Sequence, residues 1–328
     1  MNASVSNLID QHGRRKRKLR ISLTDRCNFR CRYCMPEHPQ WLPKSQLLSF
    51  EEIVRVARVM VADGIQHIRL TGGEPLLRRG LVDCVAALDA LRGQGLQRIS
   101  MTSNASLLAP LAAPLKAAGL DDLNISLDSA EPATFERMTG RPLAPVIAGI
   151  DAAVAAGLPL KLNSVLLRDD NGAQIVALTE WARARGLPLR FIEYMPLDTP
   201  GRWQREQVVS EAEILAALRE RFDVQALPRG ADPATRYVVD GDYQIGIIST
   251  VSNPFCASCD RLRITATGEL YTCLFAQTGT SLRTLLREGA ADAALLDTIR
   301  DAVWRKKAGY VTERGPVERP ITMHAMGG

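Results

Sequence analysis

Residues 19–34 read LRISLTDRCNFRCRYC, and this stretch decides the fold. Its first part, residues 19–24, is a short aliphatic run that ends in polar residues, as a buried strand does. Its second part carries Cys27, Cys31 and Cys34 in the spacing C-x3-C-x2-C, which we call the first triplet. Because parallel sheets bind ligands at the carboxyl ends of their strands, the stretch predicts a βα sheet with a site at that edge.

The same alternation recurs from residue 17 to residue 200. Strands are predicted at residues 19–24, 67–71, 98–102, 122–127, 161–167 and 189–194. The segments between them carry apolar residues three and four apart, which is the helical period. A glycine stands before five of the strands, as it does after many helices: Gly64, Gly95, Gly119, Gly157 and Gly186. Six βα units are too few for a closed eight-stranded barrel, so we predict an α/β fold with a partial, open (βα)6 barrel of the TIM type.

Polar side chains stand in or directly after each later predicted strand. They are Thr71 with Gly72-Gly73-Glu74-Pro75, Thr102-Ser103-Asn104, Ser126 with Asp128, Lys161 with Asn163, and Glu193-Tyr194-Met195-Pro196. Helix caps and turns explain any one of these groups, but they do not explain the whole set. The sequence therefore predicts one shared cavity at this edge of the sheet.

Beyond residue 200 the pattern changes. Residues 210–222 are predicted to form a short helix, residues 236–275 strands and loops, and residues 281–307 a helical stretch. A chain of 328 residues has room for about two domains. We predict a barrel domain over residues 1–200 and a C-terminal α+β domain over residues 201–328.

Cysteine is the most informative residue type in the chain. Six of the seven cysteines form two triplets, and the second triplet is Cys256, Cys259 and Cys273, spaced C-x2-C-x13-C. Cys84 lies in an apolar helical pattern, so we predict that it is a core residue. A disulfide framework is atypical of a long chain without a secretory signal, which favours metal or cluster ligation.

Two kinds of metal site fit the triplet spacing. Three thiolates on one loop can hold three irons of a four-iron cluster and leave the fourth iron open to a ligand. A structural zinc site needs four nitrogen or sulfur ligands, and His38 follows Cys34 closely enough to complete a Cys3His set. Spacing alone leaves both alternatives open.

Charge and hydropathy narrow the class of protein. There are 41 basic and 36 acidic residues, a net charge of +5, which suits an anionic substrate better than dedicated nucleic-acid binding. The basic run at residues 14–18 is predicted to be a solvated N-terminal arm. The longest apolar stretch, residues 107–120, is interrupted by prolines and a lysine and is too short for a membrane span. No apolar segment follows the basic run, so we predict a cytosolic protein.

The first triplet with Tyr33, followed one strand later by Gly72-Gly73-Glu74-Pro75, resembles the radical S-adenosylmethionine (SAM) enzymes. The resemblance implies a [4Fe-4S] cluster on the first triplet, whose open iron binds SAM and whose electron splits it to methionine and a 5′-deoxyadenosyl radical. Two glycines allow close approach of the backbone to a ligand, and a carboxylate pairs with an ammonium group. The implied SAM contacts are Tyr33, Gly73, Glu74, Ser126 and Met195.

The rest of the chain narrows the resemblance. Residues 255–263 read FCASCDRLR, and Thr272-Cys273-Leu274-Phe275 follows. Together with LRIS at residues 19–22, RFIE at residues 190–193 and the Gly-Gly terminus, they are similar to the GTP 3′,8-cyclase family, or molybdenum-cofactor biosynthesis protein A, over about residues 14–328. The resemblance implies a lyase that converts GTP to 3′,8-cyclo-7,8-dihydroguanosine 5′-triphosphate, the first step of molybdenum cofactor (molybdopterin) biosynthesis. The radical would take hydrogen from ribose C3′, and that carbon would bond to C8 of guanine.

This resemblance also implies a second [4Fe-4S] cluster on Cys256, Cys259 and Cys273, with the substrate purine on its open iron. The implied GTP contacts are Arg20, Arg69, Thr102, Lys161, Arg261, Leu262 and Arg263. Gly327 and Gly328 are implied to act in the catalytic cavity. The implied partners are GTP, an electron donor and cyclic pyranopterin monophosphate synthase as the downstream enzyme, with a homodimer allowed and no nucleic-acid or membrane partner.

Two positions depart from the family pattern. Ala105 stands where the family has glycine after the third strand, and Asp232 stands where it has glycine before Pro233-Ala234. Alanine resists positive φ, so the first departure leaves the conformation of that loop open.

Two other functions remain as alternatives. One is a radical SAM peptide maturase, which typically carries more cysteines after the position of Cys273 than this chain does. The other is a zinc-stabilised nucleic-acid-binding protein that uses the basic arm. Iron and sulfide analysis separates them, because about eight irons favours the enzyme and zinc without sulfide favours the binder.

Overall fold

The computed structural model describes residues 7–197, 203–230, 232–309 and 323–327, so Gly328 lies outside the described residues. The first half alternates strands and helices. In chain order these are β1 (Lys18–Ser22), α1 (Phe50–Ala62), β2 (His67–Thr71), α2 (Leu81–Asp89), β3 (Arg98–Ser103), α3 (Ala112–Ala117), β4 (Asp122–Ser126), α4 (Pro132–Thr139), α5 (Ala144–Ala155), β5 (Leu160–Leu166), α6 (Ile175–Ala184) and β6 (Leu189–Glu193).

The second half is mixed. It contains α7 (Glu211–Arg219), β7 (Val224–Ala226), β8 (Thr235–Val239), β9 (Tyr243–Ile248), β10 (Arg261–Ile264), β11 (Glu269–Tyr271), β12 (Thr280–Ser281), α8 (Arg283–Arg287), α9 (Asp292–Trp304) and α10 (Met323–Met326). No helix in the described parts of the chain is long and apolar enough to cross a bilayer.

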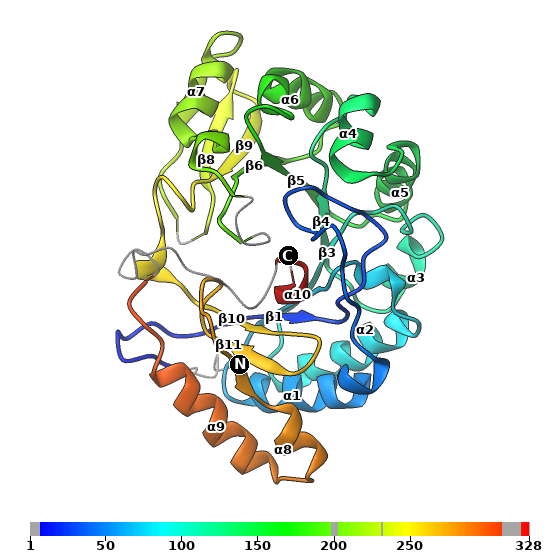
Figure 1. Ribbon diagram of the computed structural model, residues 1–328, viewed down its shortest axis with the longest axis vertical. Coiled ribbons are helices and arrows are strands. Elements are labelled where there is room, and N and C mark those ends of the chain that lie inside the picture. Colours follow the sequence, from blue (N-terminus) through cyan, green and yellow to red (C-terminus); the bar gives the residue numbers. More distant parts are fainter. Residues whose placement is uncertain (1–6, 198–202, 231, 310–322, 328) are drawn as a thin grey trace.

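These strands form one sheet in the order β12-β11-β10-β1-β2-β3-β4-β5-β6-β9-β8-β7. Strands β1 to β6 pair in parallel, each with the next in the chain. The sheet curls around a central space with helices outside it, and α10 lies inside (Figure 1). Because β12 and β7 are free edges, the barrel is open, which confirms the predicted fold class.

The C-terminal strands extend the barrel sheet on both sides. β10 pairs in parallel with β1, and β9 pairs in parallel with β6. The predicted helical stretch at residues 281–307 is two helices, α8 and α9. Gly289 lies between them with φ +73°, a left-handed conformation that ends a helix. The six barrel strands begin and end within two residues of their predicted bounds. The division of the chain at residue 200 stays a prediction.

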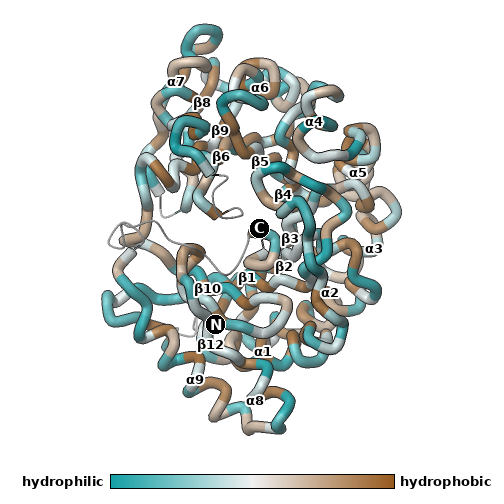
Figure 2. The backbone as a smooth tube through the Cα atoms, viewed as in Figure 1, coloured by the Kyte–Doolittle hydropathy of each residue, from teal (hydrophilic) through white to brown (hydrophobic). Residues whose placement is uncertain are grey.

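The core lies between the sheet and the outer helices. Leu19 and Ile21 of β1 are about 1% exposed and belong to the same cluster as Ile53 and Met60 of α1. Because alternate strand residues point to opposite faces, Arg20 points into the barrel instead. The outer helices carry both hydrophobic and hydrophilic residues, as amphipathic cover requires (Figure 2). The alternation of apolar and polar residues along the strand therefore places polar side chains in the barrel interior.

Gly149 is a test of how closely the helices pack on the strand ends. Alanine ordinarily favours a helix over glycine by about 1 kcal/mol. At Gly149 in α5, however, a Cβ would lie 2.1 Å from the carbonyl oxygen of Ala105. We expect Gly149→Ala to lower the free energy of unfolding by about 1–3 kcal/mol, the usual effect of overpacking. Gly93→Ala is the control, since nothing lies within 4 Å of its added Cβ. Equal urea midpoints for the two variants would contradict the close approach.

Candidate active site

The loop after β2 is hydrogen-bonded to the loop that carries the first triplet. The Gly73 N–H donates to the Thr24 carbonyl at 2.7 Å, and the Glu74 N–H donates to the Arg26 carbonyl at 2.8 Å. A Cβ on Gly73 would lie 2.3 Å from the Arg26 carbonyl oxygen. The neighbouring cysteine loop therefore requires glycine here, a reason that the sequence did not reveal.

Glu74 is buried and hydrogen-bonded to the chain itself. Its carboxylate accepts from the Leu76 N–H at 3.0 Å, the Ser103 hydroxyl at 2.8 Å and the Asn104 N–H at 2.8 Å. Burial raises its pKa to about 7, although these bonds act in the opposite direction. A carboxylate has about four acceptor positions, so one is left for an ammonium group. The contact of Glu74 with SAM stays a prediction.

The thiols of the first triplet are buried, and those of Cys31 and Cys34 lie near the carboxyl group of Asp128. Burial raises the pKa of Cys27 to about 11 and that of Cys34 to about 12, and the neighbouring thiols and Asp128 act in the same direction on Cys34. The Tyr33 hydroxyl donates to Asp128 Oδ2 at 2.7 Å and ties this loop to the end of β4. Buried thiolates need cations beside them, so the donor set fits an iron–sulfur cluster.

Single-ion metal sites do not fit the described residues. Among them, no three His, Cys, Asp or Glu side chains converge closely enough to hold one metal ion. All seven cysteines are free, and Cys84 is buried in α2 as predicted. A four-iron cluster keeps its thiolates apart because irons and sulfides lie between them. His38, the fourth ligand of the zinc alternative, is exposed.

A row of arginines crosses the barrel interior on β10, β1 and β2. Strand register places Arg263 beside Arg20, and Arg20 beside Arg69. Burial, followed by the charge of Arg261, lowers the pKa of Arg263 to about 10. Arg69 Nη1 and Thr102 Oγ1 are buried with no hydrogen-bond partner. Like charges and unused donors in one half-buried row are the features of an anion-binding surface.

The other predicted substrate residues lie around this row. Lys161 on β5 is in register with Asn124, which is in register with Thr102, so all three line the interior. Burial, then Arg190, lowers the pKa of Lys161. Arg261 Nη2 donates to Cys259 Sγ at 3.8 Å and joins the row to the second triplet. Arg261 and Arg263 share one face of β10, as predicted, while the Leu262 side chain is buried in the core.

Two predicted SAM residues lie at the same edge of the sheet. Ser126 ends β4, and Met195 is the second residue after β6. Glu193 at the end of β6 is fully buried and accepts from the N–H groups of Val251 and Ser252, both at 2.8 Å. Glu193 thus fixes the start of the loop that leads to Cys256, a role that the sequence did not reveal.

The C-terminal segment enters the barrel (Figure 1). Arg20 Nη1 donates to the Gly327 carbonyl at 3.2 Å, and a Cβ on Gly327 would lie 2.4 Å from Thr71 Oγ1. The His324 ring in α10 packs edge-on against Trp41, with centroids 6.1 Å apart. Gly327 therefore lies beside the arginine row, whereas Gly328 lies outside the described residues.

The structure shows the backbone conformation at Ala105 and the surroundings of Asp232, the two positions that depart from the family pattern. Ala105 has φ +61°, so the chain holds alanine in the left-handed conformation that the sequence left open. Asn104 Oδ1 supports it by accepting from the Ser106 N–H at 3.0 Å, as in an Asx turn. Asp232 is exposed, and its Oδ1 lies 3.9 Å from Lys18 Nζ.

The prediction of a solvated basic arm at residues 14–18 is wrong for its central residue. The Lys16 side chain is 0% exposed, while its neighbours Arg15 and Arg17 are exposed. Lys16 Nζ donates to the Cys259 carbonyl at 2.8 Å and therefore contacts the second triplet. All five residues of this run are basic, so nothing in the sequence itself signalled the buried position.

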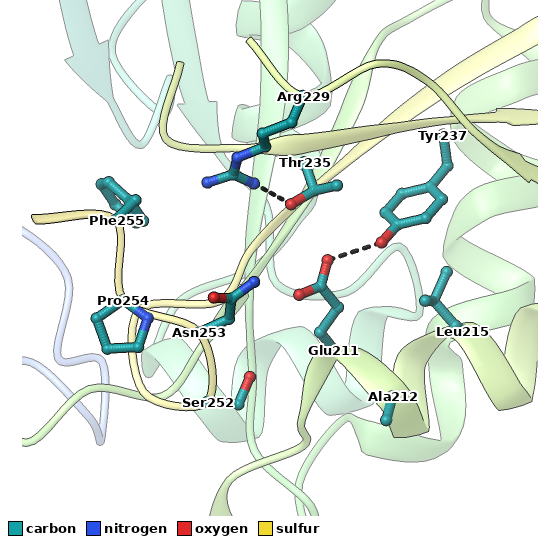
Figure 3. Close-up of a pocket in the computed structure, with 10 residues that line it drawn as sticks. All are labelled: Glu211, Ala212, Leu215, Arg229, Thr235, Tyr237, Ser252, Asn253, Pro254 and Phe255. Carbon is teal, nitrogen blue, oxygen red and sulfur yellow. Dashed lines mark hydrogen bonds between the residues drawn. The ribbon is translucent and has the colours of Figure 1, made fainter. Parts of the chain in front are cut away.

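A separate pocket of about 680 Å³ lies between α7, β8 and the loop before Cys256 (Figure 3). Tyr237 and Glu211 are joined across it by a hydrogen bond of 2.8 Å, and Phe255 lines the opposite wall. None of the candidate site residues lines this pocket. The arginines and cysteines of the candidate site therefore lie outside this pocket.

Comparison with known proteins agrees with this geometry. The Radical SAM superfamily matches residues 21–182, and Molybdenum Cofactor Synthesis C matches residues 187–312. A protein named GTP 3′,8-cyclase from Mycobacterium sp. (strain KMS) is 47% identical over 98% of this chain and 93% of its own length. One of the same name from Streptomyces coelicolor is 46% identical over 98% of this chain and 96% of its own length.

Solved structures share the fold at low sequence identity. Streptococcus suis SuiB superposes with a TM-score of 0.62 at 14% identity, over 95% of this chain and 78% of that one. The structure of anSMEcpe with bound AdoMet has a TM-score of 0.52 at 13% identity, over 62% of this chain and 56% of that one. These likenesses concern the fold, whereas the sequence relatives share nearly the whole chain. The chain belongs to the GTP 3′,8-cyclase family of radical SAM enzymes.

Proposed function

We infer that the barrel interior holds GTP between the two cysteine triplets. The chain is a radical SAM enzyme of molybdenum cofactor biosynthesis, and its reaction converts GTP to 3′,8-cyclo-7,8-dihydroguanosine 5′-triphosphate. The observation that carries the proposal is the row Arg263–Arg20–Arg69, which lies in register beside the second triplet. Guanidinium groups match phosphate oxygens in shape and charge, so the row supports triphosphate binding.

The protein's own residues position the reactants. The first cluster, when bound to Cys27, Cys31 and Cys34, supplies the electron for reductive cleavage of SAM, the source of the radical that removes hydrogen from C3′. The arginine row fixes the triphosphate, and Gly327 narrows the space beside Arg20. Such positioning matters because the reacting atoms must meet within van der Waals distance, with water excluded.

The finer assignments are proposals of the same account. Tyr33, Gly73, Glu74, Ser126 and Met195 hold SAM, and the second triplet holds a second [4Fe-4S] cluster that binds the purine. Arg261, Leu262 and Arg263 bind the triphosphate, Leu262 through its backbone, with Arg20, Arg69, Thr102 and Lys161 completing the GTP site. Support for the second cluster is that its three thiols are free and that Arg261 donates to the thiol of Cys259.

The expected partners follow from this reaction. We propose a one-electron donor for the first cluster and cyclic pyranopterin monophosphate synthase as the enzyme that takes the product. Free thiols in both triplets favour a reducing, cytosolic location. A homodimer and a functional division near residue 200 remain predictions.

Triphosphate binding tests this proposal. We expect Arg261→Ala and Arg263→Ala each to weaken GTP binding by about 1.5–3 kcal/mol, the scale of a hydrogen bond to a charged group. Guanosine lacks the phosphates and should lose little affinity in either variant. Arg287→Ala is the control, because Arg287 binds carbonyls of Ser45 and Leu47 on the outer surface. Equal losses for guanosine and GTP in anaerobic binding experiments would show that Arg261 and Arg263 are structural.

A further inference from the structure

Three cations donate to backbone carbonyls at the second triplet, two of them on cysteines and one on the residue before Cys273. Arg14 Nη1 donates to the Cys256 carbonyl at 2.9 Å, and Lys16 Nζ donates to the Cys259 carbonyl at 2.8 Å. Lys306 Nζ donates to the carbonyl of Thr272, the residue before Cys273. We call Arg14, Lys16 and Lys306 the cation triad. Its members come from both ends of the described chain.

The triad is buried, and one carboxylate lies between two of its members. The side chains of Lys16 and Asp10 are 0% exposed and lie 2.7 Å apart. Arg14 Nε also lies 2.7 Å from Asp10, and the Arg14 side chain is 8% exposed. Lys306 is 3% exposed. Asp10 thus pairs with two of the three cations, Arg14 and Lys16.

The thiol groups of the second triplet lie close to these cations. Arg261 Nη2 donates to Cys259 Sγ at 3.8 Å, and Lys16 Nζ donates to the carbonyl of the same residue. A cluster held by these thiolates would bring negative charge beside the cation triad.

The first triplet is the opposite case. There a carboxylate lies near the cysteines, because Asp128 Oδ2 accepts from the hydroxyl of Tyr33, the residue before Cys34, at 2.7 Å. A carboxylate thus lies beside the first triplet, whereas cations lie beside the second.

We propose that the cation triad is a set of positioning residues for a cluster on the second triplet, and that it raises the reduction potential of that cluster. The inference rests on the proposed second cluster. A one-electron reduction adds one negative charge to a [4Fe-4S] cluster, and buried cations stabilise the reduced form more than the oxidised form. The bonds to three carbonyls also fix the loops that present the thiolates, as ligand-supporting residues do at other metal sites.

The experiment isolates the second cluster in the full-length chain. Cys27, Cys31 and Cys34 are replaced by alanine, and the protein is reconstituted anaerobically with iron and sulfide. We expect about four irons per chain in this background. Its midpoint potential is then measured by dithionite titration with electron paramagnetic resonance. Lys16→Met and Lys306→Met, each added to this background, should lower the potential and speed iron loss to a chelator.

Matched variants separate charge from folding. Lys306→Arg keeps the charge and should keep the potential close to that of the background. Arg287→Met removes a carbonyl-binding cation from the outer surface of α8 and should leave the potential unchanged. If Lys16→Met does not fold, Lys306→Met, in a separate segment, decides the question.

The possible results separate the role of the cation triad from the existence of the second cluster. A background protein that binds no iron and sulfide would overturn the second cluster. A background protein that binds about four irons, with the same potential in Lys306→Met and in Lys306→Arg, would overturn the role of the triad and leave the second cluster standing.

Discussion

Gly327→Ala is expected to leave SAM cleavage intact and to lower formation of the cyclised nucleotide by about 100-fold, the effect of misplacing reactants by roughly 1 Å. The added Cβ would lie 2.4 Å from Thr71 Oγ1 and 3.2 Å from Ser22 Cβ, and φ at Gly327 is +87°. Alanine cannot keep this conformation without strain, so the tail must shift. Because Arg20 binds the Gly327 carbonyl, the shift would also disturb the arginine row.

The measurement compares 5′-deoxyadenosine with cyclised product in one anaerobic reaction. Gly157→Ala is the matched control, because Gly157 also has a positive φ of +65° but nothing lies within 4 Å of its added Cβ. It should keep the wild-type ratio of the two products. A normal yield from Gly327→Ala, or from a protein that lacks Gly327 and Gly328, would remove the tail from the catalytic cavity.

Serine at Cys27, Cys31 or Cys34 should abolish SAM cleavage altogether. Serine at Cys259 should instead stop GTP cyclisation while the first cluster still assembles, because the two triplets lie on separate loops. The first triplet follows β1, whereas Cys256 and Cys259 precede β10 and Cys273 follows β11. Iron content, 5′-deoxyadenosine and cyclised nucleotide are measured for each protein. We expect losses of several orders of magnitude, since removal of a reacting group leaves only the residual effect of binding.

Cys84→Ala is the control for the cysteine series. Cys84 is 2% exposed in α2 and belongs to the apolar core, so its loss should reduce stability without changing the product ratio. A Cys259→Ser protein that cyclises GTP at the wild-type rate would contradict a substrate role for the second triplet.

The parts of the fold that depend on local pattern could be predicted. Strand and helix periods placed β1 to β6, and the alternation of Arg261 and Arg263 placed both side chains on one face of β10. Polar residues at successive strand ends indicated one cavity, because parallel strands bring their carboxyl ends together. The identity of the substrate was predicted from the motifs that the chain shares with the GTP 3′,8-cyclase family.

The parts that depend on distant pairing could not be predicted. β10 lies beside β1, and residues 18–21 pair with residues 261–264, a contact that no local period encodes. Lys16 looked like a solvated residue because its partners, Asp10 and the Cys259 carbonyl, are brought to it only by the fold. Likewise Gly73 is required by the Arg26 carbonyl, which only the packing of two loops reveals.

The most direct test of the central claim uses GTP carrying deuterium at ribose C3′, with SAM and dithionite under anaerobic conditions. The account predicts that deuterium appears in 5′-deoxyadenosine and that one cyclised nucleotide forms, both identified by mass. GTP that carries the label at another ribose carbon should transfer none. Unlabelled 5′-deoxyadenosine formed while C3′-labelled GTP is consumed would contradict hydrogen removal from C3′, and with it the proposed arrangement of GTP in the barrel.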